Sequence, residues 1–171
     1  MKDQIEKAFP QSAKKKCIKT SSDSKFWISD REENPTCKLI SKLSDNCDFE
    51  VLNPQEEDIN FLAIDKCIFD DSDSKKCDCA VFNDNSFAFI EIKSTAKPRN
   101  MRKHRKKGLE QLGATIETFK RKVDFSNTEL EAYLCFSSST YPKQTASNQS
   151  KIIAFYDNYK ANLKYSNQKE F

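Results

Sequence analysis

Apolar residues along this 171-residue chain follow two different periods. The run 87–92 is dense in Phe and Ile around a single glutamate, which suits a central strand covered on both faces. Together with the run 79–82 it flanks a polar turn at 83–86, so we expect a β-hairpin. From Lys107 to Val123 the apolar residues step by three and four, which predicts an amphipathic helix. The apolar stripe of this helix consists of Leu109, Leu112, Ile116, Phe119 and Val123.

Shorter signals predict the remaining elements. Asn53–Glu57 reads as a helix start, with Asn as N-cap and Pro at the first helical position. Phe61–Phe69 and Glu131–Phe136 read as strands, and a terminal helix is expected from Ile152 to Leu163. The order helix, strand, hairpin, helix, strand, helix predicts an α/β fold with a central mixed sheet flanked by helices.

The length supports one hydrophobic core, so we expect a single domain over residues 1–171. Residues 53–136 form its expected core, 1–52 an N-terminal elaboration, and 137–171 a C-terminal loop and helix. No apolar run approaches the ~20 residues of a membrane span, and no secretion signal is apparent. A cytoplasmic protein without membrane contact is therefore expected.

The hairpin brings charged residues together. Pairing Phe82 with Phe87 places Asp78 directly opposite Glu91, and strand alternation puts Glu91 and Lys93 on one face. Opposed carboxylates with Cβ atoms ~4.5–5.5 Å apart repel each other unless a proton or cation lies between them. A charge inside an apolar strand is costly unless it is paired or binds a metal. The pattern predicts a divalent-metal site; the alternative is an edge strand whose Glu91 and Lys93 face water.

Asp78, Glu91 and Lys93 in this arrangement resemble the signature of the PD-(D/E)xK nuclease superfamily. The resemblance covers roughly residues 54–136 and implies a restriction-endonuclease-like fold with an α-β-β-β-α-β core. It further implies that Asp78, Glu91 and the Ile92 carbonyl hold Mg²⁺, with Mn²⁺ as a substitute. Lys93 would then orient or deprotonate the attacking water, or neutralise the transition state.

Other positions resemble the family only in part. Cys77 stands in place of the name-giving proline, which contacts no metal. Gln111 resembles a glutamine that helps to organise the catalytic site of RecB-type members, but the tyrosine that often follows is Thr115 here. An ordinary surface glutamine is the alternative. Glu57 or Asp58 could supply the upstream acid found in part of the superfamily, or could only favour a helix dipole.

A basic block lies between residues 97 and 107, with seven Lys or Arg and no acid. Removing these seven from the 29 basic residues leaves 22 against 26 acidic residues, so the +3 protein is a mildly acidic body with one basic block. Such a block is typical of surfaces that bind nucleic-acid phosphate, and it begins four residues after Lys93. A solvated charged face is the alternative. The residues expected to contact nucleic acid are Lys97, Arg99, Arg102, Lys103, His104, Arg105, Lys106 and Lys107.

Composition excludes several other chemistries. Two glycines cannot form a phosphate-cradling loop or a dinucleotide fingerprint. The single histidine, His104, excludes the zinc-protease helix motif and lacks an acid to orient it. Seven cysteines without a secretion signal are expected to be reduced and partly buried. A zinc site at Cys77 and Cys79, with Cys67 nearby, is the alternative.

We therefore expect a metal-dependent nuclease that hydrolyses phosphodiester bonds, with DNA favoured over RNA, acting in phage defence, restriction or repair. Two alternatives stay open. One is a non-catalytic nucleic-acid-binding module, and the other is a protein-interaction subunit that uses the basic block on an acidic partner. A homodimer or a partner protein is compatible with any of the three.

Overall fold

The structure is a computed structural model that describes residues 1–30, 36–42, 47–70, 75–93, 100–136 and 146–171. Its largest element is a mixed six-stranded sheet in the order β1-β5-β6-β7-β8-β9. Strands β5, β6 and β7 form an antiparallel meander, whereas β8 runs parallel to β7, and β9 parallel to β8. The strands are β1 (Ile18–Ser21), β5 (Ile59–Ala63), β6 (Cys79–Phe82), β7 (Ser86–Lys93), β8 (Glu129–Phe136) and β9 (Asn162–Lys164).

A smaller, four-stranded sheet has the order β10-β4-β2-β3 and draws its strands from both ends of the chain. These strands are β2 (Lys25–Ser29), β3 (Lys38–Ile40), β4 (Phe49–Leu52) and β10 (Gln168–Glu170). The helices are α1 (Lys2–Ala8), α2 (Gln11–Lys14), α3 (Met101–Lys120) and α4 (Ala146–Tyr159).

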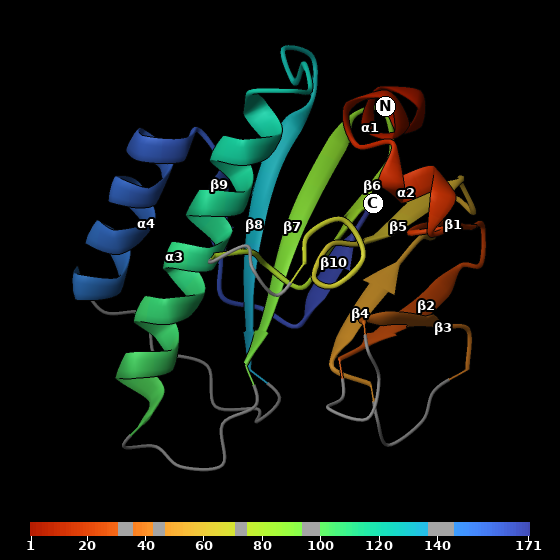
Figure 1. Ribbon diagram of the computed structural model, residues 1–171. Helices are drawn as coiled ribbons and strands as arrows, with labels where there is room; N and C mark the ends of the chain where they lie inside the picture. The colour runs from red at the N-terminus through yellow and green to blue at the C-terminus, as the bar shows by residue number, and fades with distance from the viewer. Residues whose placement is uncertain (31–35, 43–46, 71–74, 94–99, 137–145) are drawn as a thin grey trace.

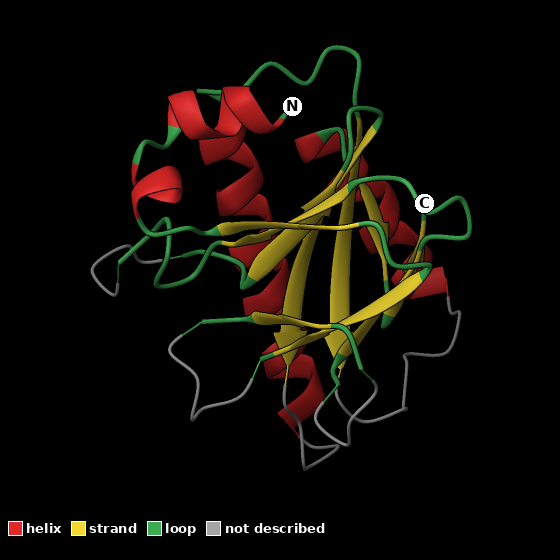
Figure 2. Cartoon of the chain, turned by 90° about the vertical axis from the view of Figure 1, so that its right-hand side faces the viewer, coloured by secondary structure: helices red, strands yellow, loops and turns green. Residues whose placement is uncertain are grey.

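The two faces of the six-stranded sheet are covered by different layers (Figure 1). On the helical side the ring of Phe119 in α3 packs edge-on against Phe89 of β7, with centroids 5.3 Å apart. On the other side Phe49 of β4 packs edge-on against Tyr133 of β8, also at 5.3 Å. Figure 2 shows the strands in front of the long helix. The six-stranded sheet is therefore buried between helices and the smaller sheet, as a parallel β7–β8 pair requires.

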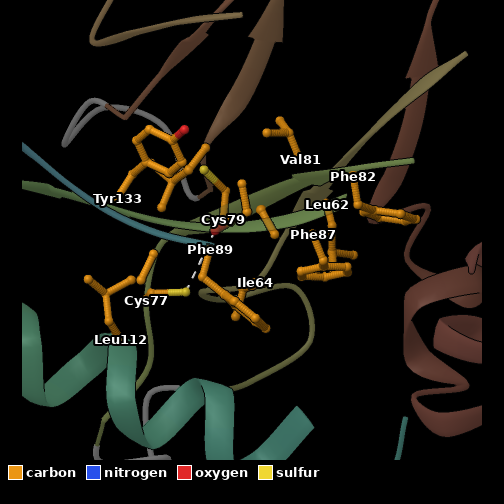
Figure 3. Packing of buried hydrophobic residues seen from close by; sticks show 14 of the residues in the cluster. Leu62, Ile64, Cys77, Cys79, Val81, Phe82, Phe87, Phe89, Leu112 and Tyr133 are labelled. Atoms are coloured by element: carbon orange, nitrogen blue, oxygen red, sulfur yellow. Dashed lines mark hydrogen bonds between the residues drawn. The ribbon is translucent and has the colours of Figure 1, made fainter. Parts of the chain in front are cut away.

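The core between these layers is rich in phenylalanine (Figure 3). Phe82 and Phe87 stack across the hairpin with their centroids 4.9 Å apart, and Phe87 lies 4.7 Å from Phe89. All three side chains are fully buried. The expectation of a central, doubly covered strand at 87–92 is confirmed, because β7 lies between β6 and β8.

The predicted α/β class with a mixed sheet is confirmed, but the helix expected at Asn53 is absent. The Asn53 side chain accepts a hydrogen bond from the Glu57 amide at 3.1 Å and donates one to the Glu57 carbonyl at 2.8 Å. Glu56 adopts φ 52°, a left-handed conformation that interrupts a helix. The segment is therefore a turn closed by an asparagine, which competes with helix formation.

Two other elements end earlier than the pattern predicts. The strand expected over residues 61–69 stops at Ala63, and Lys66 adopts φ 58° in a turn that follows it. The terminal helix ends at Tyr159 because Lys160 adopts φ 51°. Leu163 then lies in β9, so the C-terminal segment adds two strands that the pattern did not predict. None of the described helices combines the length and apolar character needed to cross a lipid bilayer.

Residues 1–52 are more than a peripheral elaboration. Strand β1 pairs with β5 in the six-stranded sheet, and β2, β3 and β4 build most of the second sheet. A disulfide joins Cys17, just before β1, to Cys67 in the turn after β5. The expectation that all seven cysteines are reduced is therefore wrong for this pair.

Candidate active site

The β6–β7 hairpin has the predicted register. Phe82 pairs with Phe87 and Cys79 with Ile90, so Asp78, just before β6, lies across from Glu91. The Asp78 side chain accepts a hydrogen bond from the backbone amide of Ile92, with Oδ2 2.6 Å from the nitrogen. The hairpin thus fixes one carboxylate against the backbone of the strand that carries the other.

Glu91 is fully buried, although it is charged and lies in the middle of an apolar strand. Its Oε1 accepts a hydrogen bond from the Lys93 ammonium, whose side chain is 12% exposed. Its Oε2 is buried and has no hydrogen-bond partner among the described residues. The alternative of an edge strand whose Glu91 faces water is wrong, because β7 is central and Glu91 is fully buried.

Gln111 connects α3 to strand β7 and to the segment that precedes β6. Its Oε1 accepts a hydrogen bond from Lys93 Nζ at 2.8 Å, and its Nε2 donates to the Lys76 carbonyl at 2.8 Å. One turn further along, Thr115 Oγ1 donates to the Gln111 carbonyl and accepts from the Cys77 amide, both at 2.8 Å. Gln111 is therefore a built-in contact of the cluster and not an ordinary surface glutamine.

A glycine lets α3 come close enough for these contacts. A Cβ atom at Gly108 would lie 2.5 Å from Leu134 Cδ1 and 3.4 Å from Glu91 Cγ. Leu134 is fully buried on β8, so it has little room to move aside. The helix packs directly over Glu91 because residue 108 has no side chain.

Electrostatics opposes full ionisation of the two acids. Burial, followed by the nearby Asp30 carboxylate, raises the pKa of Asp78 to about 7, although the Ile92 amide acts in the opposite direction. Burial, followed by the Asp78 charge, also raises the pKa of Glu91 well above its usual range, against the effect of Lys93. Two carboxylates in this state bind either protons or a cation.

The upstream acids proposed from the sequence are not part of this cluster. Glu57 accepts a hydrogen bond from Asn83 at 3.4 Å, in the turn at the opposite end of the hairpin from Asp78, and Asp58 follows it. Two other acids raise the pKa of Asp78, Asp65 after β5 and, with the larger effect, Asp30, which comes directly after β2. Sequence reasoning missed it because no motif links the second sheet to the hairpin; only its place after a short apolar strand could have suggested it.

The basic block is placed partly beside the cluster. Lys97 and Arg99 lie outside the described residues. Arg102, Lys103, Lys106 and Lys107 are exposed on the first two turns of α3, and His104 is partly exposed. Arg105 instead turns toward the C-terminal region, where it donates to Asn148 at 3.0 Å and lies over the Tyr165 ring. We therefore regard Arg105 as a structural contact between α3 and the segment after β8.

The alternative zinc site is not assembled. Cys67 is bonded to Cys17, so it cannot join Cys77 and Cys79 as a ligand. Cys77 and Cys79 are both buried, and Cys77 Sγ donates to the Cys79 carbonyl at 3.6 Å (Figure 3). Burial raises the pKa of both thiols, which opposes the thiolate form that zinc prefers.

No group of three or more His, Cys, Asp or Glu side chains among the described residues is gathered closely enough to hold a metal ion. Asp78 and Glu91 are thus a pair of carboxylates. Mg²⁺ is commonly held by one or two carboxylates together with waters and substrate phosphates, so a pair fits this ion. Comparisons of the chain with protein-family models, with curated proteins and with solved structures gave no match.

Proposed function

We propose that the protein is a metal-dependent nuclease that hydrolyses phosphodiester bonds in nucleic acid, with DNA the favoured substrate. The observation that carries this proposal is the fully buried Glu91 beside the partly buried Asp78 and Lys93, with no hydrogen-bond partner for Glu91 Oε2 among the described residues. A protein that only used this hairpin for structure would be more stable with apolar residues at these positions.

Asp78 and Glu91, together with the Ile92 carbonyl, would hold Mg²⁺, and Mn²⁺ would substitute because it prefers the same oxygen ligands. When bound, the ion would polarise the phosphoryl oxygen and stabilise the negative charge that develops on it. The role of the Ile92 carbonyl remains a prediction from the resemblance.

Lys93 is the cationic hydrogen-bond donor of the cluster. Its Nζ contacts Glu91 and Gln111, and these two acceptors orient the ammonium at the C-terminal end of β7. From there it can hold an attacking water or donate a hydrogen bond to a phosphoryl oxygen as charge builds up. Gln111 is the positioning residue, because it ties Lys93 to the Lys76 backbone.

The chain topology supports the same proposal. A meander of three strands, β5, β6 and β7, leads through helix α3 to the parallel strand β8. This order agrees with the β-β-β-α-β part of the core that the PD-(D/E)xK resemblance implies, and helices α1 and α2 precede it. The resemblance expects the two acids and the lysine at this meander; Asp78 directly precedes β6, and Glu91 and Lys93 lie on β7.

The test is cleavage of plasmid, single-stranded DNA and RNA by the purified protein with Mg²⁺, Mn²⁺ or EDTA. We expect metal-dependent cleavage by the wild type, and loss of cleavage in Asp78→Asn and Glu91→Gln. Lys93→Ala should lower turnover far more than metal affinity. Asp58→Asn, an exposed acid at the other end of the sheet, is the matched control and should cleave normally.

Full activity in Asp78→Asn or Glu91→Gln would show that the proposed active-site assignment is wrong. Salt-sensitive binding without cleavage would favour a non-catalytic nucleic-acid-binding module. Neither binding nor cleavage would favour a subunit that uses its basic block on an acidic protein. A role in phage defence, restriction or repair stays part of the proposal and depends on the substrate that this test identifies.

A further inference from the structure

Helix geometry separates the cations of α3 into two sides. Residues 104, 107 and 111 are spaced by three and four positions and share one side of the helix. Gln111 on this side contacts Lys93, so His104 and Lys107 face the same way as the catalytic cluster. Residues 102, 106 and 109 have the same spacing but start two positions earlier, which places them on the opposite side.

A groove of about 640 Å³ lies on that opposite side, between α3 and α4. Leu109 contributes apolar surface to it, and Lys151 reaches it from α4. The described residues that line the groove include five cations and no acid: Arg102, Lys103, Arg105, Lys106, Leu109 and Lys151. Lys151 lies outside the basic block, and its position in the chain does not predict that it lies beside α3.

The walls of this groove are held in place by the protein itself. Arg105 Nη1 donates to Asn148 at the start of α4 at 3.0 Å, which joins the two helices beside the groove. Further along, the Tyr159 ring of α4 packs so closely on Gly113 that a Cβ there would lie 2.3 Å from it. The groove is therefore preformed, and its cations are brought together without a ligand.

The positive charge of the groove favours the binding of a polyanion. Five cations within one groove repel each other, and binding an anion relieves this repulsion. Glu110, on the intervening part of α3, is already paired with Lys75 at 3.2 Å and does not neutralise the groove. The long aliphatic stems of the lysines and Leu109 add apolar surface against which a sugar can pack.

We infer that the groove between α3 and α4 binds the sugar-phosphate backbone of the nucleic acid beyond the bond to be cleaved, so that the substrate strand crosses α3. The inference rests on the proposed function. The two cationic sides are about one helix diameter apart, roughly 10–12 Å. That span equals about three steps of 3.4 Å along duplex DNA, so about four successive phosphates are needed to cross it, whereas a trinucleotide has only two phosphodiester groups. A regular chain of phosphates can contact both sides, and this favours nucleic acid over an acidic peptide.

The test compares a groove variant, Lys106→Gln/Lys151→Gln, with a matched control, Lys7→Gln/Lys19→Gln, which also removes two exposed lysines. Binding of a 24-base-pair duplex and of a trinucleotide is measured by fluorescence anisotropy over a salt series in EDTA. We expect the groove variant to flatten the slope of log affinity against log salt by about 1.8 for the duplex, since each phosphate contact contributes about 0.9. The control should keep the wild-type slope.

The trinucleotide is too short to span α3, so both variants should bind it as the wild type does. An unchanged duplex slope in the groove variant would overturn the inference. If the groove variant lost affinity for poly-glutamate but kept its affinity for the duplex, the groove would serve an acidic protein and the inference would also be wrong. A flattened slope in a protein that cleaves nothing would support the groove and reject the proposed catalysis.

Discussion

Gln111 accepts a hydrogen bond from Lys93, with Oε1 2.8 Å from Nζ, although the two residues lie on different elements. This contact sets the direction of the ammonium relative to Glu91. Residues that orient a catalytic group through one hydrogen bond typically change turnover by about 10–100-fold when they are removed. We therefore expect Gln111→Ala to lower kcat on cleavable DNA by that factor and to leave KM nearly unchanged.

Gln111→Glu keeps an acceptor for Lys93, but it loses the donor to the Lys76 carbonyl and adds a negative charge to the cluster. It should recover part of the lost kcat. Glu117→Gln, an exposed change on the same helix, is the control for helix stability. A wild-type kcat in Gln111→Ala would mean that Lys93 is positioned by Glu91 alone.

The buried acids make the stability of the metal-free protein depend on pH. Burial and the nearby Asp30 charge raise the pKa of Asp78 to about 7, and burial and the Asp78 charge raise the pKa of Glu91 well above its usual range. The folded state therefore holds protons that the unfolded state has released. Stability in EDTA should therefore fall as the pH rises from about 4 to about 7 and beyond. Urea unfolding followed at pH 5 and pH 8 measures this fall.

Glu91→Gln removes one of these charges. We expect it to stabilise the metal-free protein at pH 8 by about 1–3 kcal/mol, the usual cost of a buried polar group without a partner. The difference should be smaller at pH 5, where the wild-type carboxyl is protonated. Mg²⁺ should raise the melting temperature of the wild type but not that of Glu91→Gln. A variant less stable than the wild type at pH 8 would contradict the conclusion that burial and the Asp78 charge outweigh Lys93 at Glu91.

A second buried acid has the opposite pH dependence. Burial favours the neutral form of Glu131, but hydrogen bonds from Lys164 and Lys169 outweigh it and lower the pKa of this carboxyl. The stabilisation is therefore present above the unfolded pKa of about 4.3 and is lost as the pH falls through the lower folded value. The contact joins β8 to β10, with Lys169 Nζ 2.5 Å from Glu131 Oε2.

Lys169→Met should lower the free energy of unfolding at pH 7 by about 3 kcal/mol, because it leaves a buried carboxylate short of one partner. The double variant Glu131→Gln/Lys169→Met should be more stable than this single variant. Cleavage per folded molecule should not change in either, since the pair lies on the sheet face away from α3. Equal urea midpoints for the wild type and Lys169→Met would show that Lys164 alone compensates Glu131.

The two glycines of the chain both lie in α3, and we expect different results from replacing them. A methyl group at Gly108 meets the buried Leu134 at 2.5 Å and pushes on Glu91, so Gly108→Ala should cost about 1–3 kcal/mol and reduce cleavage. At Gly113 the obstacle is the far end of the Tyr159 ring, which is only partly buried. Gly113→Ala should cost less and leave cleavage per folded molecule unchanged; the reverse order would refute the packing described for Gly108.

The β6–β7 hairpin could be predicted from the sequence because the residues that determine it are close together in the chain. The pairing of Phe82 with Phe87 fixes the position of Asp78 against Glu91, and the apolar period of α3 predicts the helix that covers them. Contacts between distant segments could not be predicted in this way. Asp30 follows a strand of the second sheet, yet it lies close enough to Asp78 to raise its pKa. Gln111 donates a hydrogen bond to the backbone carbonyl of Lys76, and a pattern of side chains does not predict such a backbone contact.

The missed elements have a related cause. The turn at Asn53 carries the residues of a helix start, and only the left-handed Glu56 distinguishes the two. Strands β9 and β10 have three residues each, too few to show an alternating pattern. Lys169 is buried in β10 because Glu131 neutralises it, so polarity alone would have placed this residue in solvent.

The short connection within the β6–β7 hairpin has a consequence for folding kinetics. Residues 83–85 alone separate the two strands, so closing this loop costs little chain entropy, and the hairpin can form before distant segments meet. Its formation brings Asp78 and Glu91 together at once, and their repulsion then opposes the earliest step of folding. A divalent cation that screens this repulsion should therefore accelerate refolding, in addition to slowing unfolding.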